Sequence, residues 1–279
     1  MRRVATSGTP PEGQSASRKG VRRPGPSGLP PIGQAASTSF ATAAAPSPVE
    51  FSIAPERVLY WLLAVIAMLL LAATLGMFAY LGFGRSTAWG VRKLFDVSKE
   101  NNIPTYFSAF QLLAAAGLLG VIARHEALIR SPWRWHFLVL AVGFVVLSID
   151  EMASIHEALL SRLGRSLLGE ALYFTWLGPA FVIVALVALS YLRFLLALPR
   201  RFQVLFAASG AVFVAGAVGA EWVGSEIARD RLGDDASWAY QLQVIVEEGL
   251  EMVGIALFIY ALLLYIAQAR ISLVARVEA

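Results

Sequence analysis

Acidic side chains recur inside segments that are otherwise apolar. The first of these segments, residues 148–157, combines three carboxylates with one histidine. Carboxylate oxygens and imidazole nitrogens bind divalent metal ions, and the same groups also transfer protons. The eight candidate ligands in this and two later segments are Asp150, Glu151, His156, Glu157, Glu221, Glu247, Glu248 and Glu251.

The spacing of these residues predicts which of them share a helix face. At about 100° per residue, Asp150, Ser154 and Glu157 fall within about 60° of one another and form one polar stripe. Glu151 and His156 lie on opposite flanks of that stripe and are expected to reach neighbouring helices. In the last acidic segment, the four-residue spacing places Glu247 and Glu251 on one face.

Such charges are costly within a membrane, because one charged residue at mid-helix costs about 2.5 to 3.5 kcal/mol on insertion scales. No Lys or Arg lies within these segments before Arg229. The carboxylates are therefore expected to share protons, to line a water-filled cavity or to bind cations. For Glu157, Glu226 and His156, near the predicted helix ends, simple exposure at the membrane surface is an equal alternative.

A metal ion is the cofactor that this side-chain set suggests. Carboxylates with one histidine suit Mg²⁺, Ca²⁺, Mn²⁺ or Fe²⁺, and Zn²⁺ stays open as well. A three-histidine zinc centre is excluded, because His136 lies about 30 Å along the helix from His156. The spacing Glu151-x-x-x-x-His156 also departs from the Glu-x-x-His motif of ferritin-like di-iron bundles.

A polar segment, residues 95–108, precedes one of the apolar runs and ends at a proline suited to opening a helix. It supplies candidates for a lid or for substrate binding, with an ordinary capped loop as the alternative. These candidates are Asp96, Glu100, Asn101 and Asn102.

The elements that carry these residues are predicted to be transmembrane helices. The chain has 279 residues, 57% of them hydrophobic and 15% charged, with a mean hydropathy of +0.64. Apolar runs of about 20 residues are long enough to cross roughly 30 Å of hydrocarbon. The sequence thus predicts an all-α bundle of about six spans: Val58 to Phe83, Thr105 to Ala123, Phe137 to Leu160, Ala171 to Leu196, Phe202 to Ile227 and Tyr240 to Ala267.

Three regions are expected: a disordered tail over residues 1–50, a transmembrane domain over 51–270 and a short tail over 271–279. The first tail is basic and rich in Pro, Ser and Ala, so it cannot bury enough apolar surface to fold. Its positive charge suits anionic lipid headgroups rather than nucleic acid. The chain has no cysteine, which excludes disulfides and thiolate ligands.

The distribution of basic residues predicts the orientation. With a cytoplasmic N-terminus, fifteen of the 23 Lys and Arg residues fall inside and eight outside, so both termini are expected in the cytoplasm. Without the first 50 residues this count is nine against eight. The third, fifth and sixth spans would then bring all their acidic segments to the outer side. Their inner halves have few polar groups.

Four sequence motifs resemble those of a group of uncharacterised bacterial multi-pass inner-membrane proteins. The motifs are Asn102-Ile-Pro-Thr-Tyr-Phe-Ser108, Ser148-Ile-Asp-Glu followed by His156-Glu157, Gly219-Ala-Glu221 and Glu247-Glu-Gly-Leu-Glu-Met252. The resemblance covers about residues 95 to 267. It implies a bacterial origin and an inner-membrane location, but no reaction.

Three functions are compatible with the sequence. The first is an integral membrane protein with a divalent-metal site, and an enzyme could use such a site to activate water for attack on a lipid-borne substrate. The second is a carrier or channel in which the carboxylates relay protons or coordinate a transported cation. The third is a structural or accessory membrane subunit. Substrate, reaction and oligomeric state are not predicted.

Overall fold

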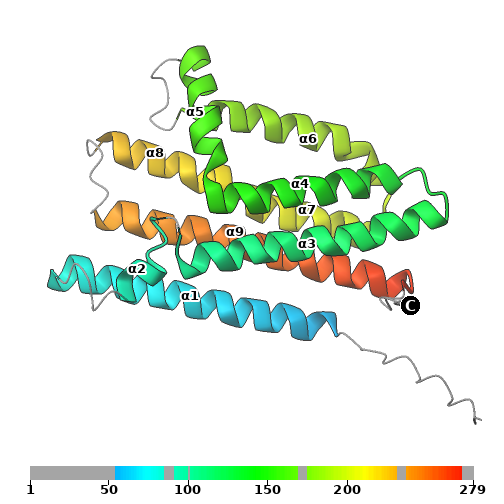
Figure 1. Ribbon diagram of the computed structural model, residues 1–279, viewed down its shortest axis with the longest axis horizontal. Coiled ribbons are helices and arrows are strands. Elements are labelled where there is room, and N and C mark those ends of the chain that lie inside the picture. Colours follow the sequence, from blue (N-terminus) through cyan, green and yellow to red (C-terminus); the bar gives the residue numbers. More distant parts are fainter. Residues whose placement is uncertain (1–53, 85–90, 100, 169–174, 231–236, 272–279) are drawn as a thin grey trace, which may run out of the picture. The chain divides into compact units, whose positions relative to one another are not determined.

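The computed structural model describes residues 54–84, 91–99, 101–168, 175–230 and 237–271. Every regular element within these residues is a helix, as the sequence predicts (Figure 1). The predicted tails over 1–50 and 271–279 lie outside the described residues, apart from Ile271. The predicted disorder of residues 1–50 is therefore not tested.

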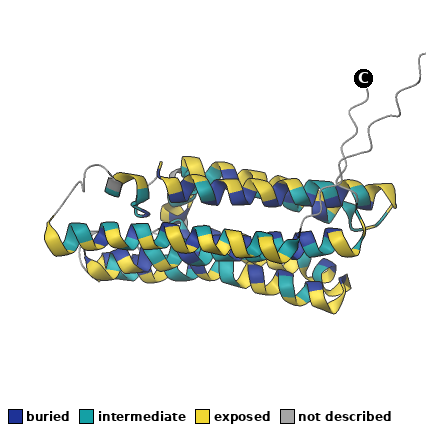
Figure 2. Cartoon of the chain, turned by 90° about the horizontal axis from the view of Figure 1, so that it is seen from below, coloured by how far each residue is buried: buried dark blue, intermediate teal, exposed yellow. Residues whose placement is uncertain are grey.

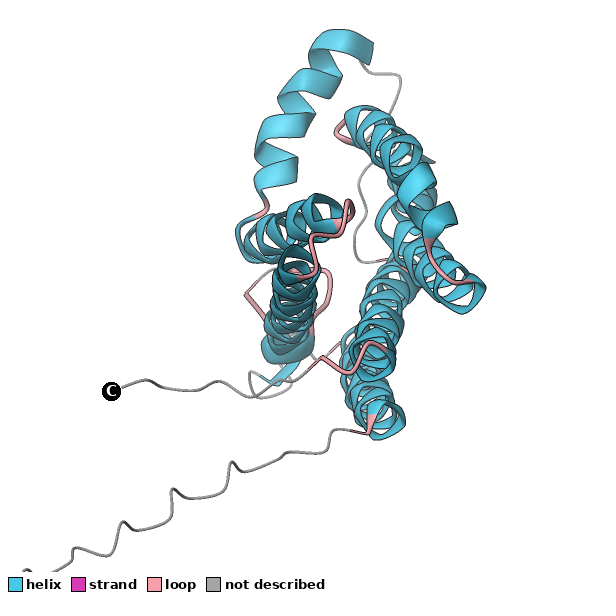
Figure 3. Ribbon diagram, turned by 90° about the vertical axis from the view of Figure 1, so that its right-hand side faces the viewer, coloured by secondary structure: helices cyan, strands magenta, loops and turns pink. Residues whose placement is uncertain are grey.

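Nine α-helices and one π-helix make up this described part. They are α1 (Pro55–Phe83), α2 (Val91–Phe95), α3 (Ile103–Leu128), α4 (Arg134–Ala153), α5 (Ile155–Leu168), α6 (Leu177–Ala197), α7 (Arg200–Val214), the π-helix η2 (Ala215–Ala220), α8 (Glu221–Asp230) and α9 (Trp238–Gln268). Figure 3 views the main helices nearly end-on.

Six helical stretches among the described residues are long and apolar enough to cross a membrane. Five of them are α1, α3, α4, α6 and α9, and the sixth is the continuous stretch Arg200–Asp230, which contains α7, η2 and α8. The prediction of an all-α bundle of six spans is confirmed. The protein is thus a multi-pass membrane protein that contacts the lipid bilayer.

Local sequence signals explain where two of these helices begin. Asn102 precedes α3, and its side-chain oxygen accepts the Thr105 backbone N–H at 2.8 Å, while Pro104 occupies the first turn. Ser237 caps α9 in the same way, accepting the Tyr240 N–H at 3.2 Å. Each cap satisfies one backbone donor that has no partner within the helix.

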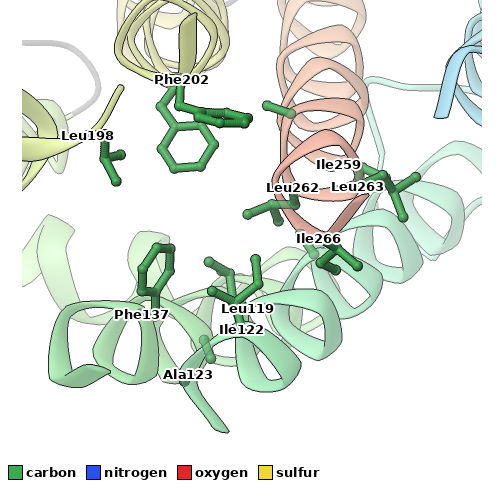
Figure 4. Packing of buried hydrophobic residues seen from close by; sticks show 14 of the residues in the cluster. Leu119, Ile122, Ala123, Phe137, Leu198, Phe202, Ile259, Leu262, Leu263 and Ile266 are labelled. Carbon is green, nitrogen blue, oxygen red and sulfur yellow. The ribbon is translucent and has the colours of Figure 1, made fainter. Parts of the chain in front are cut away.

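The last helix, α9, is the centre of the bundle. It packs against α1, α3, α7, η2 and α8, and buried positions recur along its whole length (Figure 2). Its second half joins a hydrophobic cluster in which Phe137, Phe202 and Leu262 are almost completely buried (Figure 4). This apolar cluster fills the end of the bundle where α1 begins and α9 ends.

The third predicted span is shorter than expected. A single helix from Phe137 to Leu160 is wrong, because α4 ends at Ala153 and α5 starts at Ile155 in a new direction (Figure 1). Ser154, between them, has a positive φ of 46°, which interrupts the α-helix. The stripe of Asp150, Ser154 and Glu157 on one helix face is therefore also wrong.

The fifth span contains a change of helix type that brings it close to α9. Its π-helix contains Gly216, where an added Cβ would lie 2.8 Å from the Glu247 carbonyl oxygen. On the other side of the contact, a Cβ on Gly254 of α9 would lie 2.6 Å from the Phe213 backbone nitrogen. Glycines at both points thus allow the two helices to approach at backbone contact, as small residues do in membrane helix pairs.

Candidate functional site

A cavity of about 590 Å³ lies between the helices at the end of the bundle opposite the apolar cluster. The described helices bring seven of the eight predicted ligands to its wall: Asp150, Glu151, His156, Glu221, Glu247, Glu248 and Glu251. These side chains come from α4, α5, α8 and α9. The eighth, Glu157, belongs to α5, but its side chain is outside the described residues.

The meeting of these segments confirms the predicted relative directions of three spans. The end of α4, the start of α8 and the first half of α9 must lie close together to share one cavity. Glu247 and Glu251 share a face, as their spacing predicts, and both line the cavity wall. The side of the membrane to which this end belongs is a separate question.

The turn at Ser154 brings Asp150 and His156 together. The carboxylate of Asp150 accepts the His156 backbone N–H at 2.7 Å and contacts the His156 Nδ1 atom at 2.9 Å. On the other side, the His156 ring lies against the ring of Trp176, with a centroid distance of 4.6 Å. Asp150 and His156 thus form a pair, whereas the sequence placed them on different sides of one helix.

Glu247 is part of a polar chain that links α9 to the fifth span. Gln243 donates one hydrogen bond to the Glu247 carboxyl at 2.7 Å and another to the Ala220 carbonyl oxygen of the π-helix at 2.8 Å. The Glu247 and Glu221 carboxyl groups are also within hydrogen-bonding range of each other. Two carboxylate anions repel each other at this range, so a shared proton or a bound cation would stabilise the contact.

The remaining carboxylates are electrostatic neighbours of this pair. Glu248 interacts with Glu151 and Glu221. Glu251 interacts with these three residues and with Asp150. Its side chain also packs on Gly216, where an added Cβ would lie 2.9 Å from Glu251 Cγ. The close approach at Gly216 thus helps to place α9 carboxylates opposite α4 and α8.

The described side chains do not form a preassembled metal centre. No three His, Asp or Glu side chains among them are close enough together to hold one metal ion in this conformation. The chemistry of the donor set still suits a hard divalent cation, because carboxylate oxygens predominate. A bound ion would need some of these flexible glutamate side chains to turn toward it.

Three of the four residues suggested for a lid are described, and none of these three lines the cavity. Asp96 forms an ion pair with Arg92 at 3.0 Å and accepts a hydrogen bond from the Ser98 hydroxyl at 2.6 Å. Asn102 is buried and caps α3, and its amide also donates to the Lys99 carbonyl oxygen. Both residues therefore hold the loop together.

Of the other two lid candidates, only Asn101 is described. Asn101 is exposed with a φ of 59°, and Glu100 lies outside the described residues. The part of this loop that does line the cavity consists of Val97, Ser98 and Lys99.

Sequence reasoning missed several residues of the site. Lys99 is a basic residue on the cavity wall, and its position just before the Asn-rich motif was the available signal. Trp176 and Gln243 were missed because a single aromatic ring or amide at a helix start gives no chemical pattern. Glu226 does not line the cavity, and it pairs with Arg229 at 3.4 Å.

The opposite end of the bundle is closed by apolar and aromatic side chains. His136 stacks on Phe194 with a centroid distance of 5.2 Å, and Phe194 also contacts Phe137 at 5.1 Å. Near them, Glu126 is buried and accepts a hydrogen bond from the Tyr265 hydroxyl at 2.8 Å. The inner halves of the third, fifth and sixth spans, expected to have few polar groups, pack in this apolar cluster, and Glu126 lies outside them on α3.

Comparisons with known proteins give a family and no activity. No curated protein and no solved structure matches the chain. One family model, described as a domain of unknown function (DUF8692), matches residues 61–266, which include all the residues that line the cavity. This match spans most of the chain. The protein therefore belongs to the DUF8692 family.

Proposed function

We propose that the acidic cavity binds one or two divalent metal ions, and that the protein uses them as a metal-dependent membrane enzyme acting on a lipid-borne substrate. The observation that carries this proposal is the convergence of six carboxylates and His156 on one cavity. Metal-activated water would be the nucleophile, and a carboxylate that does not bind metal would act as base.

Electrostatics supports a bound cation. Glu221 and Glu247 are in direct contact, and Glu248 and Glu251 interact with further carboxylates. Uncompensated charges of one sign at such range disfavour one another strongly in a partly buried site. A divalent ion would remove much of this repulsion, and carboxylate oxygens are its preferred ligands.

The closed opposite end favours binding or catalysis over transport. A carrier or channel needs a second polar opening, yet the described residues beyond the cavity pack in the apolar cluster of Phe137, Phe194 and Phe202. Substrate would then enter and leave on the acidic side of this cluster.

The second candidate, a proton- or cation-coupled carrier, is favoured by one contact. The Glu221–Glu247 pair could hold a shared proton in place of a metal ion. A structural or accessory role would use a bound ion only to hold α8 and α9 together.

Metal analysis separates these candidates. Protein purified in metal-free buffer and then supplied with Mn²⁺ should bind it near-stoichiometrically, measured by electron paramagnetic resonance. Glu251→Gln should weaken binding by at least about tenfold, as loss of a ligand or its support does. Glu226→Gln, a matched change outside the cavity, should leave it unaltered.

The outcome against metal binding is equally clear. No stoichiometric Mn²⁺, Mg²⁺, Ca²⁺, Fe²⁺ or Zn²⁺ under replete conditions would overturn the proposal. Flux of protons or cations in proteoliposomes, lost in Glu251→Gln, would favour the carrier.

We further propose a bacterial inner-membrane location with both termini cytoplasmic and the cavity facing outward. The resemblance in motifs supports the location, and the excess of basic residues in the N-terminal tail supports the orientation.

A further inference from the structure

The cavity has two chemically different walls. The carboxylates lie on α8, α9 and the end of α4, whereas the facing wall is apolar. The apolar wall is formed by Val146 and Leu147 of α4 and by Ala180, Ile183 and Val184 of α6. A ligand that fills this space would therefore meet charge on one side and hydrocarbon on the other.

The two helices of the apolar wall touch directly near the closed end. There, the Tyr191 hydroxyl donates to the His136 carbonyl oxygen at 3.1 Å, and Phe194 packs on Phe137. At the acidic end the link is indirect, because the His156 ring of α5 lies between Asp150 of α4 and Trp176 before α6. The cavity extends between α4 and α6 in this region.

The apolar residues of this wall also face outward. Val146 is 55% exposed and Ile183 is 47% exposed, although both line the cavity. Val146 lies seven residues before the end of α4 at Ala153, which is about 10 Å along the helix. At that depth in a transmembrane helix, the surroundings are lipid chains rather than water.

Two of the carboxylates lie at a similar or greater depth. Glu247 and Glu251 are nine and thirteen residues from the start of α9 at Trp238, which is roughly 14 to 20 Å. An amphiphile entering from the bilayer between α4 and α6 would thus bring its polar head to the acidic wall while its chain stayed in an apolar environment.

Charge decides which polar head fits. Six carboxylates and Lys99 line the cavity, which leaves five formal negative charges with a neutral histidine. One divalent ion would still leave three. A phosphate or carboxylate head would be repelled by this wall, whereas an amine head would be attracted.

We propose that the opening between α4 and α6 is a lateral entrance from the bilayer for a lipid-like amine, whose hydrocarbon chain lies against Val146, Leu147 and Ile183 and whose ammonium group binds the acidic wall. The proposal of an amine substrate rests on the proposed function, because both require the carboxylates of the cavity to bind a cation. The size of the cavity suits such a ligand, since small-molecule sites are typically about 300 to 1,000 Å³.

Photolabelling in proteoliposomes tests the entrance. The probe is a hexadecylamine that carries a diazirine in its chain, and labelled peptides are identified by mass spectrometry. Label is expected mainly on α4 and α6 near Val146 and Ile183. Excess hexadecylamine should compete for labelling, whereas ethylamine and hexadecanol, which each lack one half of the amphiphile, should compete poorly.

Two variants close the opening from opposite sides. Ile183→Trp and Val146→Trp should each reduce labelling by about tenfold, corresponding to about 1.4 kcal/mol of binding. The matched control is Val182→Trp, because Val182 is 59% exposed and does not line the cavity. Thermal unfolding of each purified variant shows that it is folded.

The outcomes separate this inference from the metal proposal. Label spread evenly over all the lipid-facing helices, or unchanged in both entrance variants, would overturn the lateral entrance even if Mn²⁺ binds. Specific labelling of α4 and α6 without any stoichiometric metal would support the entrance and overturn the metal proposal alone. Hexadecanol competing as well as hexadecylamine would overturn the amine specificity.

Discussion

At the scale of single residues, Asp150 is the best-defined member of the cavity wall. It accepts one hydrogen bond from the His156 backbone and one contact from the His156 ring, so it fixes both the turn after α4 and the direction of the imidazole. Carboxylates that orient a histidine in this way commonly support a metal ligand or a catalytic base. We therefore regard Asp150 as a positioning residue for His156.

Replacing this carboxylate should destabilise the protein. Asp150→Asn removes the charge from both hydrogen bonds, and we expect the free energy of unfolding to fall by about 1–3 kcal/mol. Thermal or denaturant unfolding in detergent measures the change. Glu226→Gln, which removes the same charge from an exposed ion pair with Arg229, should cost less than about 1 kcal/mol. Equal effects of the two substitutions would contradict the role of Asp150.

At the scale of elements, the sequence predicts the six spans but does not predict the junction between α4 and α5. The six spans follow directly from apolar length. The break at Ser154 does not, because the residues around it have ordinary helix propensities and apolar residues such as Ile155, Leu159 and Leu160 continue past it. One signal was available, since Ser154-Ile-His-Glu157 fits the pattern that marks the start of a new helix.

The positive φ of Ser154 makes this junction testable. Glycine adopts such a conformation without the steric cost of a Cβ, so Ser154→Gly should stabilise the protein by about 1 kcal/mol. The Ser154 hydroxyl is buried without a hydrogen-bond partner, and its loss removes no interaction. In contrast, Ser190→Gly, inside α6, should destabilise by about 0.5–1 kcal/mol. Thermal unfolding of each variant, compared with the natural protein, shows whether the substitution raises or lowers the stability.

The approach of the π-helix to α9 was not predictable from the sequence. A glycine-rich and alanine-rich stretch is compatible with many membrane helix contacts, and nothing in the residues 215–220 specifies the change in hydrogen bonding. The acidic residues could be placed at one end of the bundle from span directions alone. Which of them touch depends on this contact and on the turn at Ser154.

Two glycines of the fifth span provide a matched test of that contact. A Cβ on Gly216 would lie 2.8 Å from the Glu247 carbonyl oxygen, so Gly216→Ala should force α9 away, weaken Mn²⁺ binding and lower the stability by about 1–3 kcal/mol. A Cβ on Gly210, in α7, meets no atom within 4 Å, and Gly210→Ala should be neutral or stabilising by up to about 1 kcal/mol. Similar behaviour of the two variants would argue against a tight contact at Gly216.

At the scale of the whole molecule, the two ends of the described bundle differ in chemistry. One end holds the acidic cavity, and the other holds the apolar cluster with the buried Glu126–Tyr265 pair. The described helices fix which residues share an end, but the direction of the bundle in the membrane depends on the basic residues. That direction decides whether a ligand that enters from the bilayer comes from the outer or the inner leaflet.

Labelling of single introduced cysteines can determine this direction. The natural sequence has no cysteine that would also be labelled. Ser166, on α5, and Arg200, at the start of α7, are both exposed and lie at opposite ends of the long helices. With the N-terminus in the cytoplasm, a membrane-impermeant maleimide added to spheroplasts should label Ser166→Cys and spare Arg200→Cys until the membrane is permeabilised. Labelling of Arg200→Cys alone would place the cavity at the cytoplasmic face, and the lipid-like amine would then have to come from the inner leaflet.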